Sequence, residues 1–537
     1  MVSFDKLSHP YPIKRQATYG RNGMVATSQA TAAQAGLEIL KKGGNAIDAA
    51  IATAACLTVV EPTSNGIGGD AFALVWTEGK LHGLNASGCA PRNISTEKVK
   101  AAGYEEMPDY GWTPVTVPGA PSAWKALSER FGKLPLTEVL EPAIRYAEEG
   151  YAIPANLSRL WKSAYDTFKK ELKGEAFDEW FRVFAPDGHA PKAGEIWSSQ
   201  DHANTLRSIA ETNAESFYRG ELADKIVAAS EANGGYFVKE DLAECYAEWV
   251  DPISVNYRGY DVWEIPPNGQ GIIALQALKI LEGFDLTERD TVDSMHKQIE
   301  STKLAFTDAL QHVTDSKHMK HTVEEILSDA YAEHRRSLIS EEALLPVAGK
   351  PFGSGTVYLC TADNEGNMVS FIQSNYKGFG SGIVVPGTGI AMQNRGKDFK
   401  FDEEHVNVLK GGKRTYHTII PGFLTKGDQP VGPFGLMGGY MQPQGHLQLV
   451  VNTIDFKLNP QQAIDAPRWR WDYGKHVEVE ERFHHHLADG LHQKGHDIQI
   501  ALDPNGFGRG QIIWRDPETG VLVGGTESRT DGAVVAW

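Results

Sequence analysis

The sequence predicts a folded protein of α+β type, rich in helices up to about residue 355 and rich in strands after it. Three observations lead to this prediction. Hydrophobic residues make up 41% and charged residues 23% of the 537 positions, which is ordinary for a soluble globular chain. Helical patterns dominate residues 100–345. Strand-like segments between glycine-rich loops dominate the part after residue 355.

The first two helices are predicted from residue 31 onward. Residues 31–42 carry alanine and leucine at helical spacing, and the glycine pair at 43–44 ends that pattern. Asn45 suits the N-cap of a second helix over 46–60. This second helix is apolar on nearly every face, which is typical of a helix buried inside a large protein.

A glycine-rich loop at 65–69 follows the second helix. Three glycines in four residues resemble a phosphate loop, but a phosphate loop follows a strand and opens a helix. Here a helix precedes the loop, and residues 71–76 read as a strand after it. The order of elements therefore favours a tight structural turn over a nucleotide site.

The middle of the chain is predicted to be mostly helical, with a linker at its end. Residues 120–131 and 291–312 are the clearest amphipathic stretches, interrupted by strand-like segments at 253–257 and 260–263. Five prolines and glycines fall within ten residues of segment 340–356, which is typical of a linker.

A hairpin is predicted directly after this linker. Its strands are 357–362 and 368–373, with a turn at 364–367. We therefore divide the chain into a portion 1–355 and a portion 356–537.

Charge and cysteine usage exclude several classes of function. The formal net charge of −17 argues against general binding of nucleic acid or of anionic membranes. The four cysteines, at positions 56, 89, 245 and 360, lie far apart, which argues against a disulfide scaffold and a cysteine zinc site. No apolar segment is long enough to span a membrane, and no signal peptide is visible. The expectation is a reduced, cytoplasmic protein.

Thr356 is the first candidate for chemistry, because it begins a strand directly after the glycine-rich linker. Threonine is a good strand former, so Thr356 could also be there for structural reasons alone. As a nucleophile, its hydroxyl could attack the preceding carbonyl in an N→O acyl shift. Hydrolysis of that ester would leave Thr356 with a free α-amine, which can act as the base for its own hydroxyl. The α-amino pKa of about 7.7–8.0 leaves a usable neutral fraction.

An amide hydrolase also needs donors for the oxyanion. Gly438 and Gly439 lie in a run that could bring backbone N–H groups close to such an oxygen without a Cβ in the way. The alternative for this pair is an ordinary turn.

Several ordered motifs resemble one known family. They are GGNAIDAA at 43–50, EP at 61–62 with GIGG at 66–69, VPG at 117–119, PIS at 252–254 with YRGY at 257–260, PP at 266–267, and the block from Thr356 through Asp363, GN at 366–367 and FGSG at 379–382. Over nearly its whole length the chain is similar to the gamma-glutamyltransferase family of N-terminal-nucleophile hydrolases.

The resemblance implies a fold and a mechanism. The fold is a four-layer αββα sandwich, cut by the chain itself between Gly355 and Thr356 into two interdigitated fragments that remain together as a heterodimer. The reaction is acyl transfer from a small-molecule amide through Thr356, with no metal or cofactor. Gly438 and Gly439 match the oxyanion pair, Ser374 keeps a hydroxyl beside the nucleophile, and Asp398 matches the aspartate that holds the substrate amine.

The substrate pocket departs from the pattern of this family. Ser87 stands where the carboxylate-binding arginine is expected, Tyr376 replaces an asparagine, and His417 with Thr418 replaces a serine pair. Serine cannot reproduce the two-pronged arginine–carboxylate contact, so glutathione is disfavoured in the usual pose. Arg395, three residues before Asp398, is either a substitute guanidinium or a structural arginine.

The departures leave three functional readings open. The first is a self-cleaving hydrolase or acyltransferase for γ-glutamyl or related short acyl amides. The second is an amidohydrolase of the acylase-like branch, acting on a non-glutamyl substrate such as an oxamate or a cephalosporin side chain. The third is a binding protein that has lost catalysis.

Two further patterns suggest ligands but have simpler explanations. Consecutive histidines at 484–486 point in different directions, so a solvated surface is favoured over a metal site. The alternation of arginine and tryptophan at 468–471 places both indoles on one strand face, which favours packed tryptophans with exposed arginines over stacking on nucleic acid.

Overall fold

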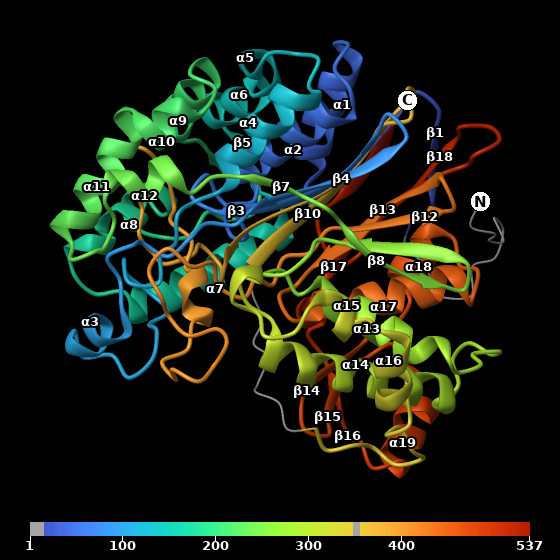
Figure 1. Cartoon of the computed structure of the whole chain (residues 1–537). Coiled ribbons are helices and arrows are strands. Elements are labelled where there is room, and N and C mark those ends of the chain that lie inside the picture. The colour runs from blue at the N-terminus through green and yellow to red at the C-terminus, as the bar shows by residue number, and fades with distance from the viewer. Residues whose placement is uncertain (1–14, 347–354) are drawn as a thin grey trace.

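A computed structural model describes residues 15–346 and 355–537 of the chain. Two seven-stranded antiparallel sheets stack on each other, and helices cover both outer faces (Figure 1). This arrangement confirms the predicted αββα sandwich. Within the described ranges, no helix is both long enough and apolar enough to cross a membrane.

Each sheet takes strands from both sides of residue 355. The first sheet runs in the order β1 (Thr18–Gly20), β18 (Leu522–Thr526), β17 (Arg509–Arg515), β13 (Gln429–Met437), β12 (Gly422–Lys426), β9 (Tyr260–Glu264) and β8 (Ile253–Tyr257). The second runs in the order β19 (Ala533–Ala536), β2 (Gly23–Thr27), β10 (Gly355–Asp363), β11 (Met368–Tyr376), β3 (Asp70–Thr77), β4 (Lys80–Ala86) and β7 (Glu248–Val250). The predicted hairpin is β10–β11, at the centre of the second sheet.

The second sheet is covered by helices of the N-terminal portion, seen at the top and left of Figure 1. They are α1 (Ala30–Lys41), α2 (Ala46–Val60), α4 (Ala120–Phe131), α5 (Leu136–Val139), α6 (Glu141–Glu149), α7 (Ala155–Glu171), α8 (Asp178–Phe184), α9 (Gln200–Glu211), α10 (Glu215–Arg219), α11 (Glu221–Ala232) and α12 (Lys239–Glu244). α3 (Thr96–Ala101) lies to one side, and β5 (Tyr151–Ala152) pairs with β6 (Ile196–Trp197).

The first sheet is covered by α13 (Gly271–Glu282), α14 (Val292–His312), α15 (Val323–Ile326), α16 (Asp329–Arg336), α17 (Met441–Ile454), α18 (Pro460–Asp465) and α19 (His485–Gln493). A small sheet of β14 (Trp469–Tyr473), β15 (His476–Glu480) and β16 (Asp497–Ala501) borders these helices. The sequence did not predict β5, β6 or β7, because strands of two or three residues depend on a partner far away in the chain.

Helix α2 is the central support of the second sheet. Asn45 caps it as predicted, accepting hydrogen bonds from the backbone of Ile47 and Asp48, and the Asp48 carboxylate accepts one from Asn45 in return. Every residue of α2 is buried. The helix packs against α1, α4, α6 and the central hairpin, which explains why no face of it is polar.

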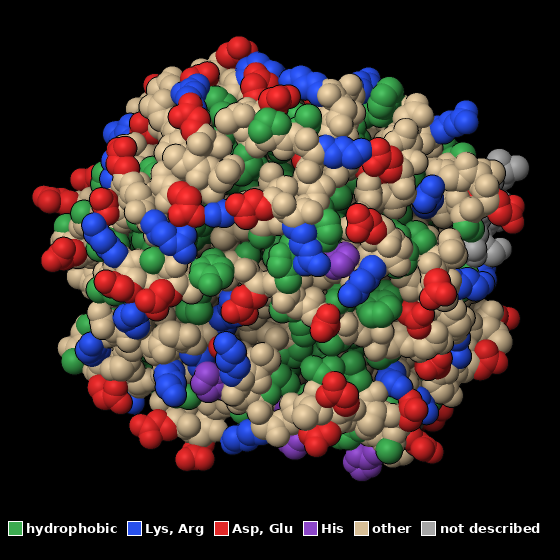
Figure 2. All heavy atoms as spheres, turned by 45° about the horizontal axis from the view of Figure 1, so that its top comes forward, with side chains coloured by type: hydrophobic (Ala, Val, Ile, Leu, Met, Phe, Trp, Pro, Cys, Tyr) green, Lys and Arg blue, Asp and Glu red, His purple; other side chains and the backbone are tan. Residues whose placement is uncertain are grey.

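The outer surface mixes both signs of charge. Figure 2 shows acidic and basic side chains interspersed over one face, without a basic stripe on it. The histidines at 484–486 are exposed, as the sequence predicted.

Arg468 corrects the expectation of exposed arginines. Trp469 and Trp471 are buried as predicted, but Arg468 is only 1% exposed. Its Nη2 donates to Glu527 Oε2 at 3.0 Å, and Arg529 pairs with both Glu527 and Glu480. The four buried charges balance one another and join the residue before β14, the end of β15 and the segment after β18. A single strand pattern could not show these distant partners.

We predict that Glu527→Gln lowers the free energy of unfolding by about 3–5 kcal/mol, because it leaves two buried guanidinium groups short of a counter-charge. Burial alone would raise the pKa of Glu527, but the two arginines outweigh this effect and lower that pKa from 4.5 to about 2. Since the folded-state pKa is the lower one, this stabilisation is complete above pH 4.5 and is lost as pH falls toward 2. Urea unfolding of both proteins at pH 7 and pH 3.5 should show the difference shrinking on acidification.

The matched control for this prediction is Glu341→Gln. The Glu341 side chain is 91% exposed in its pair with Lys494, so its removal should lower the free energy of unfolding far less than Glu527→Gln does. Equal effects of the two substitutions at pH 7 would contradict the assigned role of the buried network.

Candidate active site

Thr356 is fully buried at the start of the central strand β10, where the β10–β11 register shifts between Gly355 and Val357. Its Oγ1 donates a hydrogen bond to Ser374 Oγ at 3.0 Å. Ser374 Oγ in turn donates to the carbonyl oxygen of Gly355 at 2.7 Å. Two hydroxyls thus connect the candidate nucleophile with the carbonyl group of the peptide bond directly before it.

Tyr376 lies opposite Gly355 in the same hairpin and has an unusual backbone. Its φ of 75° is in the left-handed region, which costs energy for a bulky residue and is often found at functional sites. The backbone N–H of Tyr376 donates to Ser374 Oγ at 2.8 Å, and its phenol donates to Asp398 Oδ1 at 2.6 Å. The backbone turn of Tyr376 therefore links the hydroxyl pair to Asp398.

Arg395 and Asp398 lie on one short 3₁₀ turn and form a buried charge pair. Arg395 is 1% exposed, and its Cζ lies 4.0 Å from the centre of the Tyr376 ring. Its Nη1 donates to Thr418 Oγ1 at 2.7 Å and lies 3.7 Å from Asp398 Oδ2. Burial raises the pKa of Asp398, while Arg395 and the Tyr376 phenol oppose this rise.

Three charged atoms of this pair have no hydrogen-bond partner. They are Nε and Nη2 of Arg395 and Oδ2 of Asp398, and all three are buried. Buried polar atoms without a hydrogen bond are costly even within a charge pair, so such atoms favour a polar ligand or an ordered water beside them. Arg395 is thus a buried arginine with donors to spare, not a surface residue.

His417 belongs to a neighbouring cluster centred on Asp70. Its Nε2 lies 3.0 Å from Asp70 Oδ2, and its Nδ1 accepts from the Ile419 backbone. Burial raises the pKa of Asp70 to about 7, and burial with the nearby Arg395 holds the pKa of His417 well below its usual range. His417 is therefore neutral, with its proton on Nε2 shared with Asp70.

Ser87 lies behind this cluster. Its Oγ donates to Asn85 Oδ1 at 2.7 Å, and its carbonyl accepts from Arg414 Nε at 2.8 Å. The next residue, Gly88, donates its N–H to Asp70 Oδ1 at 3.2 Å. The Gly88 N–H thus supports Asp70, while the hydrogen bonds of Ser87 go to Asn85, Asn268 and Arg414.

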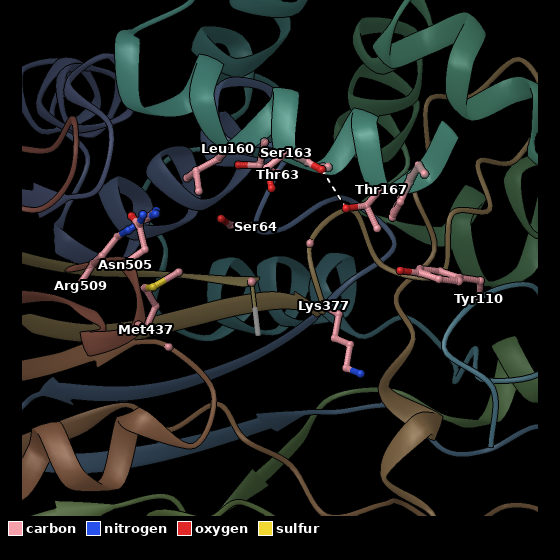
Figure 3. A pocket seen from close by; sticks show the side chains of 16 residues that line it. Thr63, Ser64, Tyr110, Leu160, Ser163, Thr167, Lys377, Met437, Asn505 and Arg509 are labelled. Atoms are coloured by element: carbon pink, nitrogen blue, oxygen red, sulfur yellow. Dashed lines mark hydrogen bonds between the residues drawn. The ribbon is translucent and has the colours of Figure 1, made fainter. Parts of the chain in front are cut away.

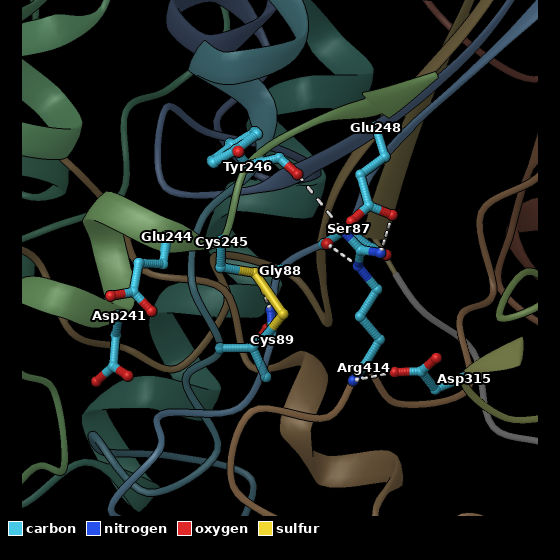
Figure 4. Close-up of a disulfide and its surroundings, with 12 residues drawn as sticks. Ser87, Gly88, Cys89, Asp241, Glu244, Cys245, Tyr246, Glu248, Asp315 and Arg414 are labelled. Carbon is cyan, nitrogen blue, oxygen red and sulfur yellow. Dashed lines mark hydrogen bonds and ion pairs between the residues drawn. A yellow bond between two sulfur atoms is a disulfide. The ribbon is translucent and has the colours of Figure 1, made fainter. Parts of the chain in front are cut away.

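A disulfide joins Cys89 to Cys245 beside this segment (Figure 4). Their Cα atoms are 6.2 Å apart although 156 positions separate them in sequence. The expectation that all cysteines stay unpaired is therefore wrong for this pair, because only the tertiary fold brings them together. Cys56 and Cys360 are free and buried.

Gly438 and Gly439 follow β13 with φ angles of 138° and 60°, conformations that favour glycine. A Cβ on Gly438 would lie 3.0 Å from Gly508 Cα. Gly438 and Gly355 line the same cleft of about 650 Å³ (Figure 3), so the first glycine of the pair and the residue preceding the candidate nucleophile border one space.

A family model for gamma-glutamyltranspeptidase matches residues 32–537. The chain belongs to this family. The glutathione hydrolase-like YwrD proenzyme of Bacillus subtilis is 37% identical over 97% of this chain and 99% of its own length. The oxamate amidohydrolase proenzyme of Klebsiella pneumoniae is 32% identical over 96% of this chain and 98% of its own.

A solved structure of cephalosporin acylase from Bacillus halodurans is 64% identical, with a TM-score of 0.96 and 99% of both chains covered. These comparisons place the chain among the hydrolases and acyltransferases of the gamma-glutamyltranspeptidase family and agree with the resemblance noted in its sequence. They also extend that resemblance to proteins named as acylases.

The fold brings most of the predicted site residues of this family member together. Direct contacts link Thr356, Ser374, Tyr376, Asp398, Arg395 and Thr418, while His417 joins them through Asp70. Asp70 itself was missed by the sequence analysis. Its signal was a single carboxylate at the start of an otherwise apolar strand, directly after the glycine-rich turn.

Among the residues that the structure describes, two histidine-containing clusters outside this site have the composition of metal ligands, one being His296, Glu300 and His496. The ammonium group of Lys303 occupies that cluster, donating to Glu300 Oε1 at 2.7 Å. In the other cluster, Arg470 pairs with Asp472 and Glu478. A protein cation thus supplies the positive charge in both.

We predict that Tyr376→Phe shifts the acid limb of the pH profile of kcat/KM upward by about one to two pH units. The lost phenol removes a hydrogen bond to the ionised form of Asp398, worth about 1.5–3 kcal/mol, so the pKa of Asp398 rises. The phenyl ring keeps the contact with Arg395. Tyr146→Phe, on α6, is the control and should leave the profile in place; an unshifted limb in Tyr376→Phe would contradict the link to Asp398.

Proposed function

We propose that this protein is a self-cleaving N-terminal-threonine amide hydrolase that forms an acyl-enzyme on Thr356 and passes the acyl group to water or an amine. The observation that carries the proposal is the hydroxyl chain from Thr356 Oγ1 through Ser374 Oγ to the Gly355 carbonyl. Membership of a family whose members are named proenzymes supports it.

The first step is cleavage of the chain. Thr356 Oγ1 attacks the Gly355 carbonyl carbon while Ser374 donates a hydrogen bond to the developing oxyanion. The bond from that carbon to the Thr356 nitrogen then breaks, the nitrogen takes up a proton, and an ester remains. Water hydrolyses the ester, which leaves a carboxylate on Gly355 and a free amine on Thr356. Because both sheets combine strands from either fragment, 1–355 and 356–537 stay together as a heterodimer.

The second step uses the new amine as a base. It takes the proton from Thr356 Oγ1 as the oxygen attacks the substrate amide. Backbone N–H groups at Gly438 and Gly439 stabilise the oxyanion, and the leaving amine takes the proton. Attack by water or a second amine on the acyl-enzyme releases the product and restores the free hydroxyl.

The buried Arg395–Asp398 pair defines the acyl pocket. The spare Nε and Nη2 of Arg395 suit a carboxylate at the end of a short acyl group, and Asp398 Oδ2 suits an amine beside it. A dicarboxylic acyl group without the amine needs Arg395 alone, whereas a γ-glutamyl group uses both residues. The name oxamate amidohydrolase, carried by one relative, favours the acyl group without the amine as the second candidate. A binding protein without catalysis is disfavoured by the intact set of hydroxyls.

Variants of the hydroxyl chain test the proposed cleavage. Thr356→Ala should remain a single chain without activity, because it lacks the attacking oxygen. Thr356→Ser keeps that oxygen and should still cleave. Ser374→Ala loses the donor to the Gly355 carbonyl and should slow cleavage by about 10²–10³-fold. Denaturing gels over time measure all three, and a Thr356→Ala protein that cleaves or works normally would rule out the nucleophile assignment.

Acyl selectivity tests the role of Arg395. With nitroanilide as a common leaving group, Arg395→Gln should reduce kcat/KM for a glutaryl amide by about 10- to 100-fold and change a butyryl amide little, since only the first carries a carboxylate. Asp398→Asn should instead affect γ-glutamyl more than glutaryl. Equal losses on glutaryl and butyryl substrates in Arg395→Gln would mean that Arg395 only supports the structure.

A further inference from the structure

The cleft lined by Gly355, the residue before Thr356, is bordered by cationic side chains. Its charged lining side chains, among the residues that the structure describes, are Lys377 and Arg509, and no carboxylate lines it. This contrasts with the net charge of −17 for the whole chain. Concave sites with one sign of charge concentrate ligands of the opposite sign. The cleft is therefore suited to an anionic group.

Arg509 is the less neutralised of the two cations. Its side chain is 6% exposed; Nη1 lies 3.3 Å from Glu61 Oε1, and Nε has no hydrogen-bond partner. Glu61 also accepts a hydrogen bond from Ser28. Arg509 therefore shares the Glu61 carboxylate with the Ser28 hydroxyl. Lys377 is paired with Asp109 at 2.6 Å. The planar guanidinium also matches a carboxylate better than an ammonium does.

The position of Arg509 relates the cleft to the reaction. Arg509 begins β17 and pairs with Met437, the residue before Gly438. Figure 3 shows Arg509 at one end of the cleft, beside Asn505, and Lys377 away from it on the other side. Arg395 and Asp398 do not line this cleft. The acyl half of an amide bound at Thr356 would thus meet Arg395, and the amine half would meet Arg509.

The wall of the cleft indicates what lies between the amide and the anionic group. Leu160, Ala164 and Phe168 come from one side of α7 and add apolar surface, and Ser163 and Thr167 add hydroxyls. A volume of about 650 Å³ is ample for a ring or a dipeptide.

We propose that Arg509 binds a carboxylate on the amine half of the substrate, so that the enzyme selects amides whose leaving amine joins an apolar body to a carboxylate. Peptides, N-acyl amino acids and N-acyl aminocarboxylate rings belong to this class. The inference rests on the proposed cleavage of acyl amides at Thr356 and adds a second selection, independent of the acyl group.

Two substrates that differ only in this carboxylate test the proposal: glutaryl amides of 4-aminobenzoate and of 4-aminobenzamide. The wild-type protein should have a kcat/KM about tenfold or more higher for the aminobenzoate amide, because a charge-assisted hydrogen bond contributes roughly this factor. Arg509→Gln should bring the ratio near one while leaving the aminobenzamide amide within about threefold. A ratio near one in the wild type, or a ratio unchanged by Arg509→Gln, overturns the proposal.

Three further variants serve as controls. Lys377→Gln and the exposed Arg130→Gln should keep the preference; loss of preference in Lys377→Gln alone would assign the carboxylate to Lys377 and overturn the role of Arg509. Should Arg509→Gln fail to fold or cleave, Arg509→Lys is measured instead, and it should lower the ratio severalfold because it keeps the charge without the fork. An unchanged ratio in Arg509→Lys overturns the proposal as well.

A binding measurement separates this proposal from the proposed function. Calorimetry with 4-aminobenzoate and 4-aminobenzamide needs neither self-cleavage nor turnover. Tighter binding of the benzoate to the wild type, lost in Arg509→Gln, supports the anion site even if Thr356 proves inactive. Equal binding of both compounds, or none, contradicts it even if Thr356 is the nucleophile.

Discussion

The pairing of β10 with β11 is the constraint on which the rest of the site depends. It sets Thr356 Oγ1 against Ser374 Oγ, and Ser374 against the Gly355 carbonyl. Both strands are central in their sheet; β11 is buried throughout, and β10 is buried at every residue after Gly355. A hydroxyl pair held by two central strands has little freedom to move, which is the preorganisation that attack on an adjacent carbonyl requires. The positive φ of Tyr376 completes the arrangement, because it turns that backbone N–H onto Ser374.

The charged groups around this hairpin differ in how completely they are paired. Arg395 and Asp398 form a charge pair but keep donors and an acceptor without a hydrogen bond, whereas Asp70 and His417 are hydrogen-bonded to each other. Away from the site, the Arg468–Glu527–Arg529–Glu480 network is closed on itself. This difference separates a structural charge cluster, whose groups are satisfied, from a ligand pocket, whose groups are not. Lys377 and Arg509 in the cleft differ in the same way, because Lys377 is paired with Asp109 and Arg509 keeps an Nε without a hydrogen bond.

The sequence correctly predicted the features that depend on residues close together in the chain. The Asn45 cap, the all-apolar helix after it and the hairpin around residue 365 follow from nearby residues, and the structure has all three. Motif resemblance located Thr356, Ser374, Asp398 and the glycine pair. It could not decide whether Arg395 was buried, foresee that Cys89 would meet Cys245, or assign Asp70 a partner. Each of these depends on segments that lie more than 100 positions apart or on the packing around one side chain.

The most direct test of the central claim is to locate the acyl group during turnover. Purified protein is mixed with a slow glutaryl amide, quenched in acid, digested and analysed by mass spectrometry. The account predicts that the glutaryl group is found on a peptide whose N-terminus is Thr356, in a protein already cut after Gly355. A glutaryl group on another residue, or turnover by a chain still intact at this bond, would contradict it.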